Sequence, residues 1–272
     1  MSFSGARVLA LESRRADETA ELIRRNGGEP FVAPSMREVP LEDNHEALAF
    51  LDHLRAGDFD MVIFLTGVGA RLLFRIAATR MPTEQLVEAL RRTTTVARGP
   101  KPVAALREIG LTPSISVPEP NTWREILQAI EGHPARRIAV QEYGRPNQDL
   151  IRELEKRGAE VTAVPVYQWQ LPEDLAPLKE AARRIEQGEA DVILFTSSAQ
   201  LDHLFSIAPD PQALLRGLQR LMIASIGPTT TETLRRYGLE PTLEPSHPKL
   251  GILVREAAEA WSRRRPAPAH ES

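Results

Sequence analysis

The sequence repeats itself, and the repeat begins in the middle of a structural unit. Three matched pairs of segments carry it: Arg7–Leu11 with Arg137–Gln141, Met61–Thr66 with Asp191–Thr196, and Gly99-Pro100 with Gly227-Pro228. A period of about 130 residues is far longer than that of solenoid or propeller repeats, so it indicates a duplicated domain. The chain of 272 residues is long enough for two such domains.

Short β-branched runs alternate with amphipathic helical stretches along the whole chain. This alternation predicts parallel sheets covered by helices on both faces, an α/β fold. Ten strand candidates give five strands for each copy, which suits a doubly wound, flavodoxin-like unit. The candidates lie at residues 7–11, 29–33, 60–65, 93–97, 114–117, 136–141, 160–164, 190–195, 221–226 and 240–243.

Because the repeat starts within a unit, the first strand, helix and strand should complete the sheet built by the end of the chain. We therefore expect a discontinuous lobe 1 (1–35 plus 170–262) and a lobe 2 (36–169). The two proline-bracketed crossings, 34–40 and 164–172, should lie side by side as a two-stranded connector. A binding cleft is expected between the lobes, and residues 263–272 are predicted to be a disordered tail.

Composition excludes several classes of function. The net charge of -3 gives no basic surplus for nucleic acid, and the absence of cysteine removes disulfides and thiol chemistry. The six histidines are scattered without ligand spacing, so no metal site is expected. The N-terminal residues lack a secretory pattern, and no apolar run approaches the roughly 18 residues of a membrane helix. We expect a cytoplasmic protein that binds no membrane.

The clearest chemical signals lie where strands end, because open parallel sheets bind ligands at their carboxyl edge. Thr196, Ser197 and Ser198 follow a hydrophobic strand and open a helix. Three hydroxyls with free helical N–H groups would form a binding site for a carboxylate or phosphate. The structural alternative is that Ser197 or Ser198 only caps the helix.

A second turn of this kind follows the next strand. Gly227 should allow close backbone approach, and Thr229 with Glu232 fits a capping box. Thr230 would then be available for a ligand. Two anion-binding sites in one lobe predict a ligand that carries several negative groups.

In lobe 2 the equivalent turns contain Thr66-Gly67 and Arg98. Gly67 would offer backbone N–H donors, and Arg98 adds positive charge. Gln141 ends the strand 136–141, in front of a loop in which Asn147 can cap the next helix. Tyr167, in the returning connector, could direct its phenol into the cleft, although an aromatic residue at a hinge can also simply pack.

With these features in place, the chain resembles uroporphyrinogen-III synthase over residues 5 to 262. The resemblance is carried by the order and spacing of four segments: Val164-Pro165-Val166-Tyr167, Phe195-Thr196-Ser197-Ser198, Ile226-Gly227-Pro228-Thr229-Thr230, and Glu244-Pro245-Ser246-His247-Pro248 with the following Lys249–Leu253. It implies a monomeric, cofactor-free enzyme of tetrapyrrole and heme synthesis, a lyase. Such an enzyme closes linear hydroxymethylbilane to uroporphyrinogen III, with inversion of the terminal pyrrole ring and loss of water.

The resemblance also implies roles for individual residues. Tyr167 looks like the family's tyrosine, which is proposed to donate a hydrogen bond or proton to the leaving hydroxyl. The turns that contain Thr66, Thr196 and Gly227 would bind the substrate, whose eight carboxylates suit hydroxyls and helix N-termini. The task is mainly one of positioning the chain of rings.

Two departures from the family pattern leave other functions open. Lobe 2 has Thr66-Gly67-Val68 where many members show Thr-Ser followed by an asparagine-containing turn, and its Arg98–Pro102 segment lacks the paired threonines. A non-catalytic tetrapyrrole or anion sensor of the same fold is therefore an alternative. A two-lobed binding protein for a small anionic metabolite is a third, disfavoured by the missing export signal.

Overall fold

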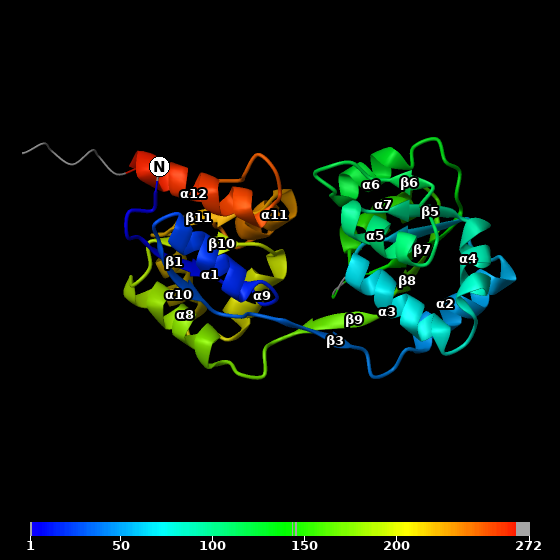
Figure 1. Ribbon diagram of the computed structural model, residues 1–272, viewed down its shortest axis with the longest axis horizontal. Helices are drawn as coiled ribbons and strands as arrows, with labels where there is room; N and C mark the ends of the chain where they lie inside the picture. The colour runs from blue at the N-terminus through cyan, green and yellow to red at the C-terminus, as the bar shows by residue number, and fades with distance from the viewer. Residues whose placement is uncertain (1, 143, 145, 265–272) are drawn as a thin grey trace, which may run out of the picture. The chain divides into compact units, whose positions relative to one another are not determined.

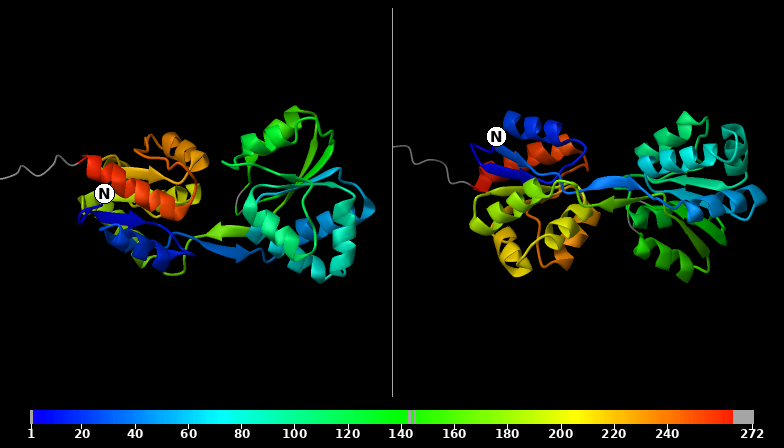
Figure 2. Two further views of the ribbon diagram at one scale, coloured as in Figure 1. Left: turned by 45° about the horizontal axis from the view of Figure 1, so that its top comes forward. Right: turned by 90° about the horizontal axis from the view of Figure 1, so that it is seen from below.

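The computed structural model describes residues 2–142, 144 and 146–264, and the chain divides into two compact units. Lobe 1 consists of Met1–Arg37 with Gln170–Ser272, and lobe 2 of Glu38–Trp169. The chain passes between them through β3 (Arg37–Pro40) and β9 (Tyr167–Gln170), which pair as a separate two-stranded sheet (Figures 1 and 2). No helix in the described part is both long and apolar enough to cross a membrane.

Lobe 2 is built on five parallel strands in the order β6-β5-β4-β7-β8. Their bounds are β4 (Met61–Phe64), β5 (Thr94–Ala97), β6 (Ile115–Ser116), β7 (Arg137–Gln141) and β8 (Glu160–Val164). Counted along this lobe the order is 3-2-1-4-5, so the doubly wound class is confirmed while the strand order differs from the 2-1-3-4-5 of flavodoxin. The order reverses between β4 and β7, the place where such sheets bind ligands.

Helices cover both faces of this sheet. They are α2 (His45–Ala56), α3 (Gly67–Ala78), α4 (Thr83–Arg91), α5 (Pro100–Glu108), α6 (Trp123–Ala129) and α7 (Gln148–Lys156). Helices α2, α3, α4 and α5 pack against one another, and α6 packs against α7 (Figure 2). All four residues of β4 are buried, as expected for a central parallel strand covered on both sides.

Lobe 1 has four parallel strands in the order β11-β10-β1-β2. Their bounds are β1 (Arg7–Ala10), β2 (Glu29–Val32), β10 (Val192–Phe195) and β11 (Met222–Ser225). The N-terminal strands thus complete the sheet of the C-terminal segment, as the repeat predicted. The expected fifth strand at 240–243 is reduced to one bridge between Ala224 and Leu243, because Pro241 has no N–H to continue a ladder.

Side chains of β10 alternate between two hydrophobic clusters of lobe 1. Ile193 and Phe195 pack on one face with α8 (Ala176–Gln187), α9 (Ser198–Ser206), α10 (Pro211–Leu218) and α11 (Pro228–Arg236). Val192 and Leu194 pack on the other with α1 (Ala16–Arg25) and α12 (Leu250–Arg264) (Figure 1). The predicted tail began at 263, but α12 includes Arg263 and Arg264; the rest of that prediction, 265–272, lies outside the described residues.

The structure shifts one part of the repeat by a residue. Met61 pairs with Ile138 in lobe 2, and Val192 pairs with Val8 in lobe 1. Met61 therefore corresponds to Val192, and the match of Met61 with Asp191 inferred from the sequence is wrong. Thr66 consequently corresponds to Ser197, and each of these two residues is the N-cap of the following helix.

Candidate active site

Three of the predicted residues meet at the carboxyl end of β4 in lobe 2. Thr66 Oγ1 accepts the N–H of Gly69 at 3.0 Å, which caps α3, and the N–H of Thr66 donates to Gln141 Oε1 at 3.3 Å. The hydroxyl of Tyr167 lies 3.3 Å from Thr66 Oγ1. Strands β4, β7 and β9 thus bring a threonine, a glutamine and a phenol together at the point where the strand order reverses.

Gln141 is fully buried and holds this turn in place. Its Oε1 accepts from Thr66, while its Nε2 donates to the backbone oxygen of Glu142. A Cβ at Gly69 would overlap the Gln141 amide, and one at Gly67 would lie 2.6 Å from the backbone oxygen of Lys101. The two glycines therefore make room for the Gln141 side chain and for the close approach of α3 to α5.

Tyr167 belongs to the hydrophobic core of lobe 2 and is 4% exposed. Because its ring is packed on all sides, the position of its hydroxyl beside Thr66 is well defined. A phenylalanine would fill the same space.

Glu142 is a buried carboxyl group that the motifs did not single out. It is 5% exposed, and its Oε1 has no hydrogen-bond partner among the described residues. Burial raises the pKa of Glu142 above its usual value of 4.5, and an N–H of Asn147 opposes this in part. Asn147 caps α7 by accepting the N–H of Leu150, as predicted. Tyr143 and Arg145, between them, lie outside the described residues.

Replacing Glu142 by glutamine should change how stability depends on pH. Because the folded pKa of Glu142 is raised, the carboxyl stabilises the fold fully below its unfolded pKa, and this contribution is lost as the pH rises through the folded pKa. Glu142→Gln removes the titrating group. The melting temperature of the variant minus that of the wild type should therefore be larger at pH 8 than at pH 4. Melting curves at the two pH values test this, and an unchanged difference would contradict it.

In lobe 1, the turn at residues 196–198 is largely satisfied by its own side chains. Ser197 caps α9 in a capping box with Gln200. Gln200 Oε1 accepts the N–H groups of Thr196 and Ser197 at 2.8 and 3.3 Å, and Thr196 Oγ1 donates to Glu12 Oε2 at 2.6 Å. The expectation of free helical N–H groups is therefore only partly met: Ser197 Oγ accepts the N–H of Ala199, and the Gln200 amide accepts the two N–H groups that precede the helix. Ser198 is buried within the first turn of α9.

The turn at Gly227 differs, because no side chain caps α11. The predicted capping box of Thr229 with Glu232 is wrong, since Pro228 already begins the helix and places Thr229 inside its first turn. Gly227 has extended backbone, and an added Cβ would only touch Pro248 at 3.7 Å, so close approach does not require glycine here. Thr230 is 4% exposed.

Lobe 2 has the matching arrangement at Gly99, where α5 also begins without a side-chain cap. Gly99 has a φ of 86°, and a Cβ there would overlap the side chain of Asn121, so this position does require glycine. Arg98 directly follows β5, and its N–H donates to the backbone oxygen of Phe64 at 3.0 Å. In each lobe, the helix after the central strand (α3 and α9) starts with a side-chain cap, and the helix after the next strand (α5 and α11) starts with an uncapped Gly-Pro.

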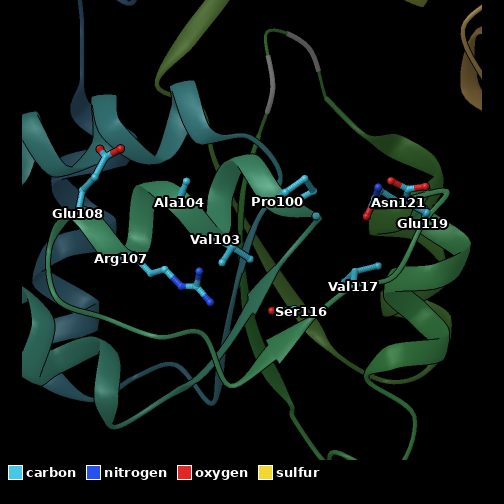
Figure 3. Close-up of a pocket in the computed structure, with 10 residues that line it drawn as sticks. Pro100, Val103, Ala104, Arg107, Glu108, Ser116, Val117, Glu119 and Asn121 are labelled. Carbon is cyan, nitrogen blue, oxygen red and sulfur yellow. The ribbon is translucent and has the colours of Figure 1, made fainter. Parts of the chain in front are cut away.

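A cavity of about 760 Å³ lies beside α5 and the loop after β6. Figure 3 shows Val103 and Arg107 extending from α5 beside Ser116, with Asn121 on the facing loop. Arg107 is exposed and forms no ion pair with a described residue. No sequence motif indicated Arg107, Ser116 or Asn121, because they come from α5, from β6 and from the loop after β6, which only the fold brings to one cavity.

Comparisons with known proteins show the family of the chain. The family described as Uroporphyrinogen-III synthase HemD matches residues 17–255. A Methanothermobacter thermautotrophicus protein named "Putative uroporphyrinogen-III synthase" is 31% identical over 233 residues, 83% of this chain and 87% of that protein. The uncharacterized protein YjjA of Bacillus subtilis is 28% identical over 268 residues, 94% and 96% of the two chains.

Solved structures extend the similarity to three dimensions. The crystal structure of a mutant uroporphyrinogen III synthase from Thermus thermophilus superimposes with a TM-score of 0.74 at 27% identity, covering 95% of this chain and all of that one. The match spans both lobes and their connector, well beyond half of the chain. The chain therefore belongs to the uroporphyrinogen-III synthase family.

Proposed function

We propose that this protein converts hydroxymethylbilane to uroporphyrinogen III, with inversion of the terminal pyrrole ring and loss of water. Besides family membership, the observation that supports this most is the position of Tyr167. Its hydroxyl lies at the carboxyl end of β4, 3.3 Å from Thr66 Oγ1, where the strand order of lobe 2 reverses. A hydrogen-bond donor at this edge can assist a hydroxyl that must leave the substrate as water.

The protein has to supply little of the covalent chemistry of this reaction. The pyrrole nitrogen of the substrate supplies the electrons that expel the hydroxyl, giving an azafulvene that a substituted ring carbon then attacks to form a spiro intermediate. The phenol of Tyr167 is a weak acid at neutral pH, so its contribution is modest compared with that of positioning the rings. Gln141 and Gly69 keep Thr66 in register with Tyr167.

The carboxylates of the substrate suit the two uncapped helix starts. At α5 and α11 the N-cap residue is a glycine that supplies no side-chain cap, and the positive end of each helix dipole attracts anions, although Pro100, Pro102 and Pro228 offer no N–H. We propose that Arg98, Gly227, Thr229 and Thr230 bind carboxylates there, with Thr66, Gly67, Thr196, Ser197 and Ser198 shaping the neighbouring turns. Arg107, in the last turn of α5, is a further cation and lines the cavity beside that helix.

Replacing Thr230 by valine should weaken binding of uroporphyrinogen III about 10-fold, the usual effect of losing one hydrogen bond to a charged group. Valine keeps the branched shape that this buried position holds, so the free energy of unfolding should change by less than about 1 kcal/mol. Thr233→Val is the matched control, because Thr233 Oγ1 donates to the backbone oxygen of Thr229 at 3.1 Å. Anaerobic titration with product measures both; equal affinities of the two variants would count against the assignment of Thr230.

The function itself is tested by adding the protein to enzymatically generated hydroxymethylbilane. We expect the type III isomer to form in excess over the type I isomer that arises by spontaneous closure. Formation of type I alone would refute the proposal.

The same experiment addresses a tetrapyrrole sensor. The sensor is favoured by one observation, which is that the polar groups of Gln141 and Gln200 are already occupied within the protein. Tight binding of product without any formation of type III would support the sensor over the enzyme.

A further inference from the structure

The repeat places a glutamate at the same position in both lobes. Glu12 follows β1, and Glu142 follows β7. In each sheet this strand is the one across which the order reverses, with β10 beside β1 and β4 beside β7. Both carboxyl groups therefore stand at the carboxyl edge where a doubly wound sheet receives its ligand.

A buried network fixes the carboxylate of Glu12. Gln200, which is 2% exposed, donates from Nε2 to Thr196 Oγ1 at 2.8 Å and to the backbone oxygen of Leu11 at 3.1 Å. Because Thr196 Oγ1 accepts this bond, its single hydrogen is directed to Glu12 Oε2, 2.6 Å away. The glutamate is thus held in one orientation by groups that pack inside lobe 1.

The two glutamates differ in burial and in their hydrogen bonds. Glu142 is buried, and burial raises its pKa. Glu12 is partly exposed and forms no ion pair with any described residue. Arg15 interacts with Glu12 only through its charge, because two nitrogens of Arg15 donate to the carboxylate of Glu18. Glu12 is therefore an oriented, partly exposed carboxylate that forms no ion pair within the described part of the chain.

A carboxylate can only accept hydrogen bonds, so it selects one part of the proposed substrate. The peripheral carboxylates of hydroxymethylbilane would be repelled by Glu12, whereas the pyrrole N–H groups are donors. When the carbon–oxygen bond of the hydroxymethyl group breaks, its electron pair leaves with oxygen, which takes one proton from solvent or another donor and departs as water. The nitrogen lone pair forms the new double bond, and the ring carries one positive charge until a proton is lost.

We propose, resting on the function proposed above, that Glu12 accepts the N–H of the ring that loses its hydroxyl and stabilises the positive charge on that ring. Electrostatic stabilisation of charge that develops only in the transition state raises kcat without tightening binding of the ground state. Repulsion between Glu12 and the peripheral carboxylates weakens binding. Glu12 should therefore raise kcat and lower the affinity for product.

Glu12→Gln tests this proposal, because the amide oxygen can still accept from Thr196 while the charge is gone. We expect kcat for type III formation to fall about 10- to 100-fold, with the Kd for uroporphyrinogen III unchanged or lower. Glu12→Asp keeps the charge and should retain more activity than Glu12→Gln. Asp17→Asn, which removes an exposed charge from the first turn of α1, is the control and should keep wild-type kcat.

The outcomes separate this inference from the proposed function. If the wild type forms no type III isomer, the function fails, and the role of Glu12 fails with it. If the wild type is active and folded Glu12→Gln stays within twofold of its kcat, the inference alone is overturned. Should Glu12→Gln not fold, Glu12→Ser against Glu12→Asp makes the same comparison, and equal rates for those two would overturn it.

Discussion

Replacing Tyr167 by phenylalanine is expected to lower the turnover of hydroxymethylbilane about 10- to 1000-fold while the protein stays folded. The ring is 4% exposed within the core of lobe 2, and phenylalanine keeps that packing. The substitution removes the hydroxyl that lies 3.3 Å from Thr66 Oγ1, at a stability cost of about 0.5–1.5 kcal/mol for one neutral hydrogen bond. Single-turnover formation of the type III isomer, measured beside a melting curve, separates the two effects.

Tyr237→Phe provides a matched control in lobe 1. Its hydroxyl donates to Asp202 Oδ1 at 3.0 Å, and its ring stacks on Phe205. The control should lose a comparable amount of stability and keep wild-type turnover. Wild-type turnover by folded Tyr167→Phe would reduce Tyr167 to a packing residue.

Gly67→Ala should destabilise lobe 2 by about 2 kcal/mol or more. The added Cβ would lie 2.6 Å from the backbone oxygen of Lys101, and a backbone atom cannot move aside as the end of a flexible side chain can. Helix α3 would have to separate from α5, which shifts the Thr66 cap together with the start of α5. We therefore expect substrate binding to weaken as well.

Gly251→Ala is the control for this substitution. Gly251 also lies in the first turn of a helix, α12, but nothing lies within 4 Å of its added Cβ. Because alanine favours helix over glycine, this variant should be unchanged or stabilised by up to about 1 kcal/mol. Thermal and urea unfolding of both variants would test the difference; equal stabilities would show that α3 and α5 can separate at no cost.

Much of the fold could be predicted from the sequence because its strongest signals are local. Apolar runs such as Val192–Phe195 mark central strands, and their recurrence after a long interval revealed the discontinuous lobe. The prediction of a strand at 240–243 was wrong, because only one bridge forms there. Thr242 has β propensity, but Pro241 has no N–H to donate to a neighbouring strand.

The candidate site was predictable only in part. Hydroxyl residues after strands marked the turns; Ser197 caps α9, which was the structural alternative to ligand binding, and Asn147 caps α7. The partners of these turns could not be read from spacing, because Gln200 reaches Leu11 across 189 positions of the chain. The burial of Glu142 likewise depends on tertiary packing.

The discontinuous sheet of lobe 1 also orders events during synthesis. Val8 pairs with Val192, so the first strand cannot enter its sheet until most of the chain has been made. Lobe 2 is continuous in sequence and has all its strands by Val164, so it can fold earlier. Lobe 2 lies between Arg37 and Gln170, and the pairing of β3 with β9 brings these two residues together. The folding of lobe 2 therefore offsets the entropy cost of closing this long loop before lobe 1 forms. Until then β1 can pair with β2 but lacks β10 on its other side, so the apolar run Val8–Leu11 is exposed to aggregation or to a chaperone.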